Sequence, residues 1–157
     1  MKITYRYSDR GARAATAKLR REIGKDARAA GRDVARKQCV PPARTAAPSV
    51  YRDAVKPYAT TRGVGVRIGG SREIQSIAGW LEFGGAISAK GRGVLTFQVD
   101  GRWVRVRTVH RARSRDGHYI GRVMTSPALV GDVHRTMQRE LTRVLDKHLT
   151  RSGASVQ

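Results

Sequence analysis

Cysteine, acidic residues, aromatic residues and long apolar runs are all scarce in this sequence. The single cysteine, Cys39, excludes an intrachain disulfide and a zinc site built from cysteines, and we expect it to fill apolar space near a helix end. No stretch reaches about 18 consecutive apolar residues, so no membrane-spanning helix is predicted. The first residues contain no apolar run of signal length, and we therefore expect the chain to be made and kept in a cytoplasm-like compartment.

Basic residues are abundant, with 32 Lys and Arg against 12 Asp and Glu and a formal net charge of +20. Such a charge favours polyanionic partners, namely DNA, RNA or an anionic membrane surface. Most of the basic residues are arginines, and a GC-rich coding sequence would produce the same bias. Because the charge is spread along the whole chain, it does not form a basic arm. Two interpretations therefore stand: charge directed at DNA, or genome composition combined with an acidic assembly partner.

Length and hydrophobic content predict one domain with a modest core. The sequence has 157 residues, of which 39% are hydrophobic and 6% aromatic. The core must therefore consist mainly of Ala, Val, Leu and Ile. We assign residues 1–150 to a single domain and residues 151–157 to a flexible C-terminal tail.

Apolar residues at helical spacing predict a long N-terminal helix and a closing helix. Between about residues 9 and 39, apolar positions recur every three or four residues, with Arg and Lys on the remaining faces. Because proline disrupts a helix, the Pro41-Pro42 pair is expected to end the first one. The Ser126-Pro127 pair is typical of a helix start, and this last helix is expected to continue to about residue 150. A shorter helix is predicted over residues 71–83.

The remaining predicted elements are short. Strands or extended segments are expected over residues 1–7, 64–68 and 119–124. Polar or glycine-rich loops are expected over residues 41–61, 84–93 and 110–118, the first with one helical turn at residues 50–55.

A β-hairpin over residues 94–109 is the clearest local prediction. Asp100 and Gly101 lie between two alternating runs, and an Asp-Gly pair there favours a two-residue turn. Pairing outward from the turn separates the side chains into two faces. Leu95, Phe97, Val104 and Val106 share the face that we assign to the core. Thr96, Gln98, Trp103, Arg105 and Arg107 share the other face, which suits single-strand stacking, a protein partner or simply solvent.

Catalytic chemistry has little support in the sequence. His110, Asp116 and His118 lie close together and faintly suggest a metal-dependent nuclease, but the following helix adds no pair of metal ligands at helical spacing. Glu82 has no acidic partner nearby in the sequence, and the glycines of residues 63–70 do not match a phosphate-binding loop. We predict that the chain is not an enzyme and has no catalytic, metal or cofactor site.

Three segments in order resemble one family of viral structural proteins. They are "APSVYRDAV" (residues 47–55), "IAGWLEFGGA" (residues 77–86) and "SPAL" (residues 126–129). Together with the order of helices and hairpin, they are similar to the tail-completion, or head–tail joining, proteins found in the neck of long-tailed double-stranded DNA bacteriophages. That family carries a "YA-x-x-hydrophobic-E-F-G-T/G" signature before a variable loop, and we call its counterpart in this chain the aromatic–Glu–Phe–Gly segment. The matching residues here are Ala78, Leu81, Glu82, Phe83, Gly84 and Gly85, with Trp80 nearby. The first segment departs from the family pattern, because its expected Gly and Leu are replaced.

The resemblance implies an α+β fold, in which a small antiparallel sheet is flanked by a long N-terminal helix and a C-terminal helix. It further implies a homo-oligomeric ring, most simply a hexamer, around the DNA path at the head–tail junction of the virion, with assembly in the host cytoplasm. The partners would be other copies of the chain, neighbouring neck and tail-terminator proteins, and genomic DNA bound without sequence specificity; no membrane is implied. A tail terminator, a minor capsid component and a small basic nucleic-acid-binding protein are the alternatives.

Two sets of residues are candidates for contacts in such a ring. Trp80, Glu82, Phe83, Gly84 and Gly85 form the predicted subunit or partner interface, where Glu82 would pair with an arginine of a neighbour. The alternative is a buried turn in which Glu82 caps a helix or pairs within its own subunit. Lys90, Arg92, Trp103, Arg105 and Arg107 form the predicted face toward the DNA lumen or the adjoining ring.

Overall fold

The computed structural model describes residues 9–99 and 101–151 and has an α+β fold, as expected. The helices are α1 (Asp9–Val34), a π-helical turn η1 (Ala35–Cys39), α2 (Val40–Ala46), α3 (Ser49–Arg52), α4 (Arg72–Phe83), α5 (Ile120–Met124) and α6 (Pro127–Arg151). The strands are β1 (Val55–Thr60), β2 (Gly63–Ile68), β3 (Gly85–Ser88), β4 (Leu95–Val99), β5 (Arg102–Val106) and β6 (Thr108–Arg111). The strand expected over residues 1–7 lies outside the described residues, as does nearly all of the expected tail.

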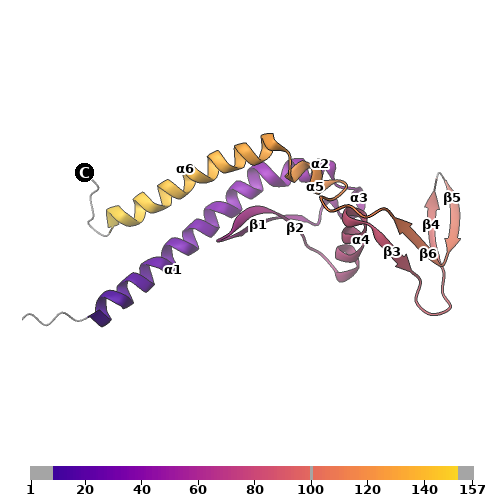
Figure 1. Cartoon of the computed structure of the whole chain (residues 1–157), viewed down its shortest axis with the longest axis horizontal. Coiled ribbons are helices and arrows are strands. Elements are labelled where there is room, and N and C mark those ends of the chain that lie inside the picture. Colours follow the sequence, from indigo (N-terminus) through magenta and orange to yellow (C-terminus); the bar gives the residue numbers. More distant parts are fainter. Residues whose placement is uncertain (1–8, 100, 152–157) are drawn as a thin grey trace, which may run out of the picture.

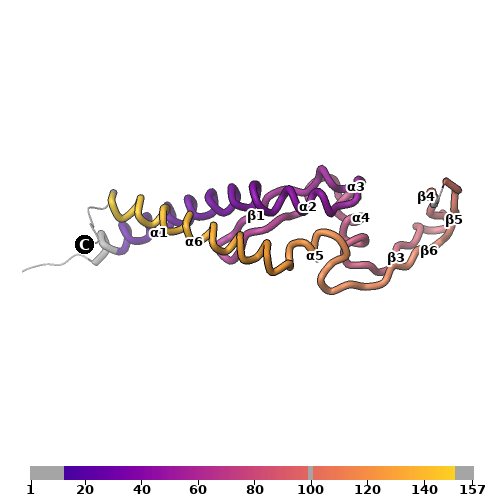
Figure 2. Tube along the Cα trace, turned by 90° about the horizontal axis from the view of Figure 1, so that it is seen from above, coloured from indigo at the N-terminus to yellow at the C-terminus, as the bar shows by residue number. Residues whose placement is uncertain are grey.

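The molecule is elongated, with the start of α1 at one end and the β4–β5 hairpin at the other (Figures 1 and 2). Helices α1 and α6 run side by side in opposite directions and pack through their apolar faces. Asp26 of α1 ties the pair together, because its carboxylate lies 2.8 Å from Nζ of Lys147 and 3.2 Å from Nε2 of the buried His148. Along the described residues, no helix is both long and apolar enough to cross a membrane.

The first helical segment continues through Pro41 and Pro42 instead of ending there. After α1, the turn η1 shifts the hydrogen bonds by one residue, with the Val40 N–H donating to the Ala35 carbonyl. The two prolines then fall in the first turn of α2. Proline is tolerated in that turn because N–H groups there have no acceptor in the preceding turn of their own helix. The expectation that the proline pair ends the helix was therefore wrong.

The core is centred on α2, α3, β1 and α4. Tyr51 and Val55, each at most 1% exposed, pack there with Ala43, Ala78 and other small residues. Cys39, the last residue of η1, is also fully buried, which confirms its expected place as an apolar filler near a helix end. The predicted helical turn near residue 50 is present as α3, but residues 55–60 form strand β1 and not a loop.

The strands form three separate two-stranded antiparallel sheets, β1–β2, β3–β6 and β4–β5. The predicted hairpin register is confirmed, with Phe97 opposite Val104 and Leu95 opposite Val106. Strands β3 and β6 were not predicted, because each has only four residues and the paired residues lie 20 to 26 positions apart in the chain. Residues 120–124 form helix α5 rather than an extended segment.

Candidate assembly interface

Glu82, the acid of the aromatic–Glu–Phe–Gly segment, points inward from α4 and is only 3% exposed. Its Oε1 accepts hydrogen bonds from the Tyr51 hydroxyl at 2.6 Å and the Ile120 N–H at 3.0 Å. Its Oε2 accepts from the N–H groups of Tyr119 and Gly121, each at 3.3 Å. One carboxylate therefore joins α3, α4 and the start of α5, and accepts hydrogen bonds from three backbone N–H groups there, in a part of a helix where N–H groups lack acceptors of their own. We call this cluster the Glu82 junction.

Hydrogen bonding keeps the Glu82 carboxyl ionised despite its burial. Burial by itself would raise the pKa of this group. The hydrogen bonds from Tyr51 and from the three backbone N–H groups oppose that effect, and the net result is a lowered pKa. Burial and the adjacent carboxylate raise the pKa of the Tyr51 hydroxyl, which stays a donor.

The hypothesis that Glu82 pairs with an arginine of a neighbouring subunit is corrected by this geometry. Its two oxygen atoms are occupied by donors of its own chain, and the side chain is shielded from solvent. The alternative considered from the sequence, a buried Glu that caps a helix, describes the site. In the sequence, Glu82 is recognisable only as an isolated acid among apolar residues. Its role as an acceptor was not predictable, because its donors lie 31 and 37–39 residues away.

The rest of the segment divides between structure and surface. The Trp80 indole N–H donates to the Gly85 carbonyl at 3.0 Å. This half-buried ring therefore links the end of α4 to the first residue of β3. Gly84 ends the helix at a φ of 75°, and a Cβ there would overlap the Ala112 backbone oxygen. Gly85 begins strand β3. Phe83 points outward and is 56% exposed, so it is the residue of this set that is available to a partner.

Beyond β3 and β6, the chain extends into an arm that we define as residues 89–107. It carries the β4–β5 hairpin, and neither strand packs substantially on any other described element. The apolar face assigned to the core from the sequence is only half buried at all four of its positions. The core assignment was therefore wrong for Leu95, Phe97, Val104 and Val106, although their shared face is confirmed. The reason is that the hairpin projects away from the helices instead of lying against them.

The opposite face of the arm carries the residues predicted to face DNA or an adjoining ring. Trp103 is 72% exposed, and Arg105 and Arg107 are exposed beside it. Lys90 and Arg92 are exposed in the loop at the base of the arm, where Arg107 donates to the Gly91 carbonyl at 3.5 Å. The structure thus brings these five residues into the same arm.

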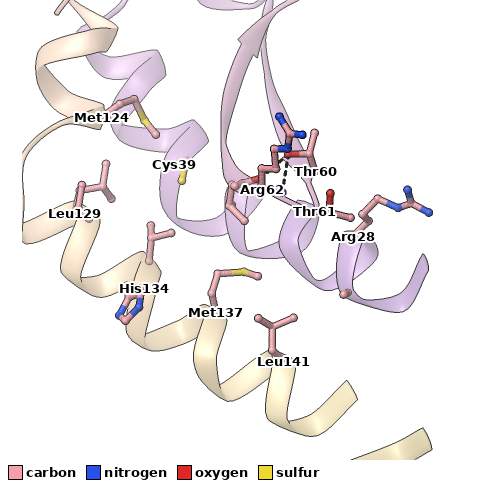
Figure 3. A pocket seen from close by; sticks show the side chains of 15 residues that line it. Arg28, Cys39, Thr60, Thr61, Arg62, Met124, Leu129, His134, Met137 and Leu141 are labelled. Carbon is pink, nitrogen blue, oxygen red and sulfur yellow. Dashed lines mark hydrogen bonds between the residues drawn. The ribbon is translucent and has the colours of Figure 1, made fainter. Parts of the chain in front are cut away.

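A groove of about 410 Å³ opens elsewhere, between α1, the β1–β2 turn and α6 (Figure 3). Its lining is mainly apolar and includes Cys39, Met124, Met137 and Leu141. This groove was not predicted, because it is formed by elements that are far apart in the chain. Its rim continues along α6 as partly exposed apolar side chains, namely Val130 (51%), Leu141 (37%), Leu145 (46%) and Leu149 (37%).

The residues of the faint nuclease hypothesis do not form a metal site in the described structure. His110 is exposed on β6, and the Nε2 atom of His118 lies 3.1 Å from the Ala112 carbonyl. Within residues 9–99 and 101–151, no group of three or more His, Cys, Asp or Glu side chains is placed to hold a metal ion. That the chain is not an enzyme remains a prediction.

Comparison with known proteins adds no assignment: no family model, curated protein or solved structure matches this chain.

Proposed function

We propose that this chain is a structural subunit of the neck of a long-tailed double-stranded DNA bacteriophage. It would assemble into a ring, most simply a hexamer, around the DNA path and join completed tails to DNA-filled heads. Its partners would be further copies of itself and the adjoining neck and tail-terminator proteins. The proposal combines the sequence resemblance with one structural observation, the half-covered apolar face of the arm.

The arm supports this proposal because an isolated two-stranded hairpin is at best marginally stable in water. Its four apolar side chains are each only partly buried, and both outer strand edges are free of other described strands. Covering such side chains would contribute about 1 kcal/mol each. A neighbouring subunit that covers this face, or extends the hairpin by a further strand, would supply the missing contacts.

The decisive test is to inactivate the gene in the phage that encodes this chain and to image the lysate by electron microscopy. Filled heads beside complete but unattached tails would support the proposal. Normal virions, or heads that fail to package DNA, would contradict it.

A more specific test changes the arm alone. Replacing the cross-strand pair Phe97 and Val104 by serine (F97S/V104S) removes apolar surface from the face that we propose to be covered. We expect loss of infectious particles and accumulation of unattached tails. The matched control, T96S/Q98S, changes two exposed polar residues on the opposite face of the same strand and should assemble far better. Equal assembly by both variants would contradict a role for the apolar face.

A small basic nucleic-acid-binding protein is the second candidate function. The formal net charge of +20 favours it, because cationic surfaces bind phosphate backbones by releasing counterions. It would show steeply salt-dependent DNA binding and would leave head–tail joining intact when the gene is inactivated. Electron microscopy of the same lysate therefore distinguishes the two candidate functions.

A further inference from the structure

Helix α1 carries a continuous stripe of positive charge. Lys18, Arg21, Lys25, Arg28 and Arg32 follow one another at alternating spacings of three and four residues. At 3.6 residues per turn this spacing keeps all five on one side of the helix, over a length of about 21 Å. We call these five residues the α1 stripe.

The stripe is exposed and its charges are not neutralised by neighbours. All five residues are exposed, and none of them forms an ion pair within the described part of the chain. The acids in this stretch lie along one side of the stripe. Glu22 is four residues from Lys18 and three from Lys25, but within the described residues it forms no ion pair with either. Of the other acids, Asp26 is bound to Lys147 and His148 of α6, and Asp33 lies 3.5 Å from Arg36.

The other side of α1 is already used by the fold. Helix α6 and the β1–β2 hairpin pack against its apolar face, which includes Ile23, Ala27 and Val34. A helix that binds a membrane surface inserts its apolar face between the lipids. That face of α1 is covered except along the groove, which Ala27 and Arg28 line, so the charged side is the main surface that α1 offers to a partner.

We infer that the α1 stripe is a binding surface for the phosphate backbone of double-stranded DNA, without sequence specificity. The α1 stripe is a straight, rigid row of cations, and duplex DNA is a straight, rigid polyanion. A duplex segment as long as the stripe carries about twelve phosphate charges, counting both strands. Helix α1 contains no aromatic residue, so it lacks the side chains on which the bases of single strands stack. The inference rests on the proposed function for its biological setting, and it moves the main DNA contact from the arm to the opposite half of the molecule.

The test compares two variants of the purified full-length chain that lose the same charge. R21Q/R28Q/R32Q removes three arginines from the α1 stripe, and R102Q/R105Q/R107Q removes three from the arm. Glutamine keeps a high helix propensity, and circular dichroism and thermal unfolding establish that both variants fold. Affinity for a short random-sequence duplex is measured by fluorescence anisotropy over a series of salt concentrations.

We expect the stripe variant to lose roughly tenfold or more in duplex affinity, and its slope of log affinity against log salt to fall by about 3. The arm variant should lose much less. An equal loss in both variants would mean that net charge alone drives binding, and a larger loss in the arm variant would place the contact there; either result overturns the inference. Tighter binding of the unaltered chain to single-stranded oligothymidine, double-stranded RNA or phosphatidylserine vesicles than to duplex DNA would also overturn it.

This measurement is independent of the neck assignment. If inactivating the gene leaves virions normal while the stripe variant still loses duplex affinity, the neck proposal fails and the α1 stripe remains a DNA surface. If tails remain unattached without the protein but both variants bind duplex DNA equally, the inference about the stripe fails and the neck proposal stands.

Discussion

The Glu82 junction and the arm are close together in the chain, yet they place their polar and apolar side chains in opposite ways. The junction buries a carboxylate and surrounds it with four hydrogen-bond donors. The arm leaves Leu95, Phe97 and their partners only partly buried. In the junction, both carboxylate oxygens of Glu82 have donors within the chain. In the arm, the apolar groups are not fully covered, and this contrast separates the part that holds the subunit together from the part that is available to other molecules.

The contrast also changes how the aromatic–Glu–Phe–Gly segment is understood. Trp80 and Glu82 serve the internal structure through the contacts to Gly85 and to the start of α5. Phe83, between Glu82 and Gly84, is exposed. A single short motif thus contributes both to folding and to the surface, and mutations within it should have different effects.

The largest effect is expected from Glu82→Ala. Removing the carboxylate leaves three backbone N–H groups and the Tyr51 hydroxyl without an acceptor, at a cost of about 3 kcal/mol or more in the free energy of unfolding. Chemical denaturation monitored by circular dichroism measures this loss. Glu73→Ala, on the exposed surface of the same helix, is the control and should cost less than about 1 kcal/mol. Similar losses in the two variants would show that the junction has no special role.

Gly84→Ala should be nearly as severe. The new Cβ would overlap the Ala112 backbone oxygen at a positive φ, and we expect a loss of about 2 kcal/mol or more in the free energy of unfolding. Gly24 of α1 has open space around it, so Gly24→Ala should instead stabilise the protein by about 0.5–1 kcal/mol. Thermal unfolding of the two variants should therefore shift in opposite directions, and a parallel shift would contradict the described packing.

Acid should weaken the junction before it affects the arm. Because the pKa of Glu82 in the folded chain lies below its ordinary value of 4.5, its contribution to stability is complete above that value and disappears as the pH falls through the folded-state pKa. The unaltered chain should lose stability on acidification below about pH 4.5 more steeply than Glu82→Gln. Urea denaturation at a series of pH values gives both slopes. Parallel curves would show that Glu82 does not titrate with unfolding.

The smallest effect on stability is expected in the arm. F97S/V104S should change the free energy of unfolding by less than about 1 kcal/mol, because both side chains are already partly exposed. The midpoint of thermal unfolding should stay close to that of the unaltered chain even where particle assembly is lost. A loss as large as that of Glu82→Ala would mean that the arm belongs to the folding core, and the contrast drawn above would be wrong.

Local sequence was sufficient to determine the elements whose information lies within a few residues. The periodicities of α1, α4 and α6, and the register of strands β4 and β5, follow from side chains three, four or two positions apart. The basic character of α1 is equally local. These features were predictable because backbone geometry alone decides which side chains share a face.

Only the tertiary structure decided where those faces point and what covers them. The same alternation that makes one face of the hairpin apolar does not say whether that face meets a helix of the same chain or a neighbour. Glu82 found its donors more than thirty residues away, and the prolines were accommodated by the hydrogen-bond shift in η1. Burial depends on contacts between distant segments, so a residue pattern determines an element and its faces, whereas packing determines which face becomes core and which remains free to bind.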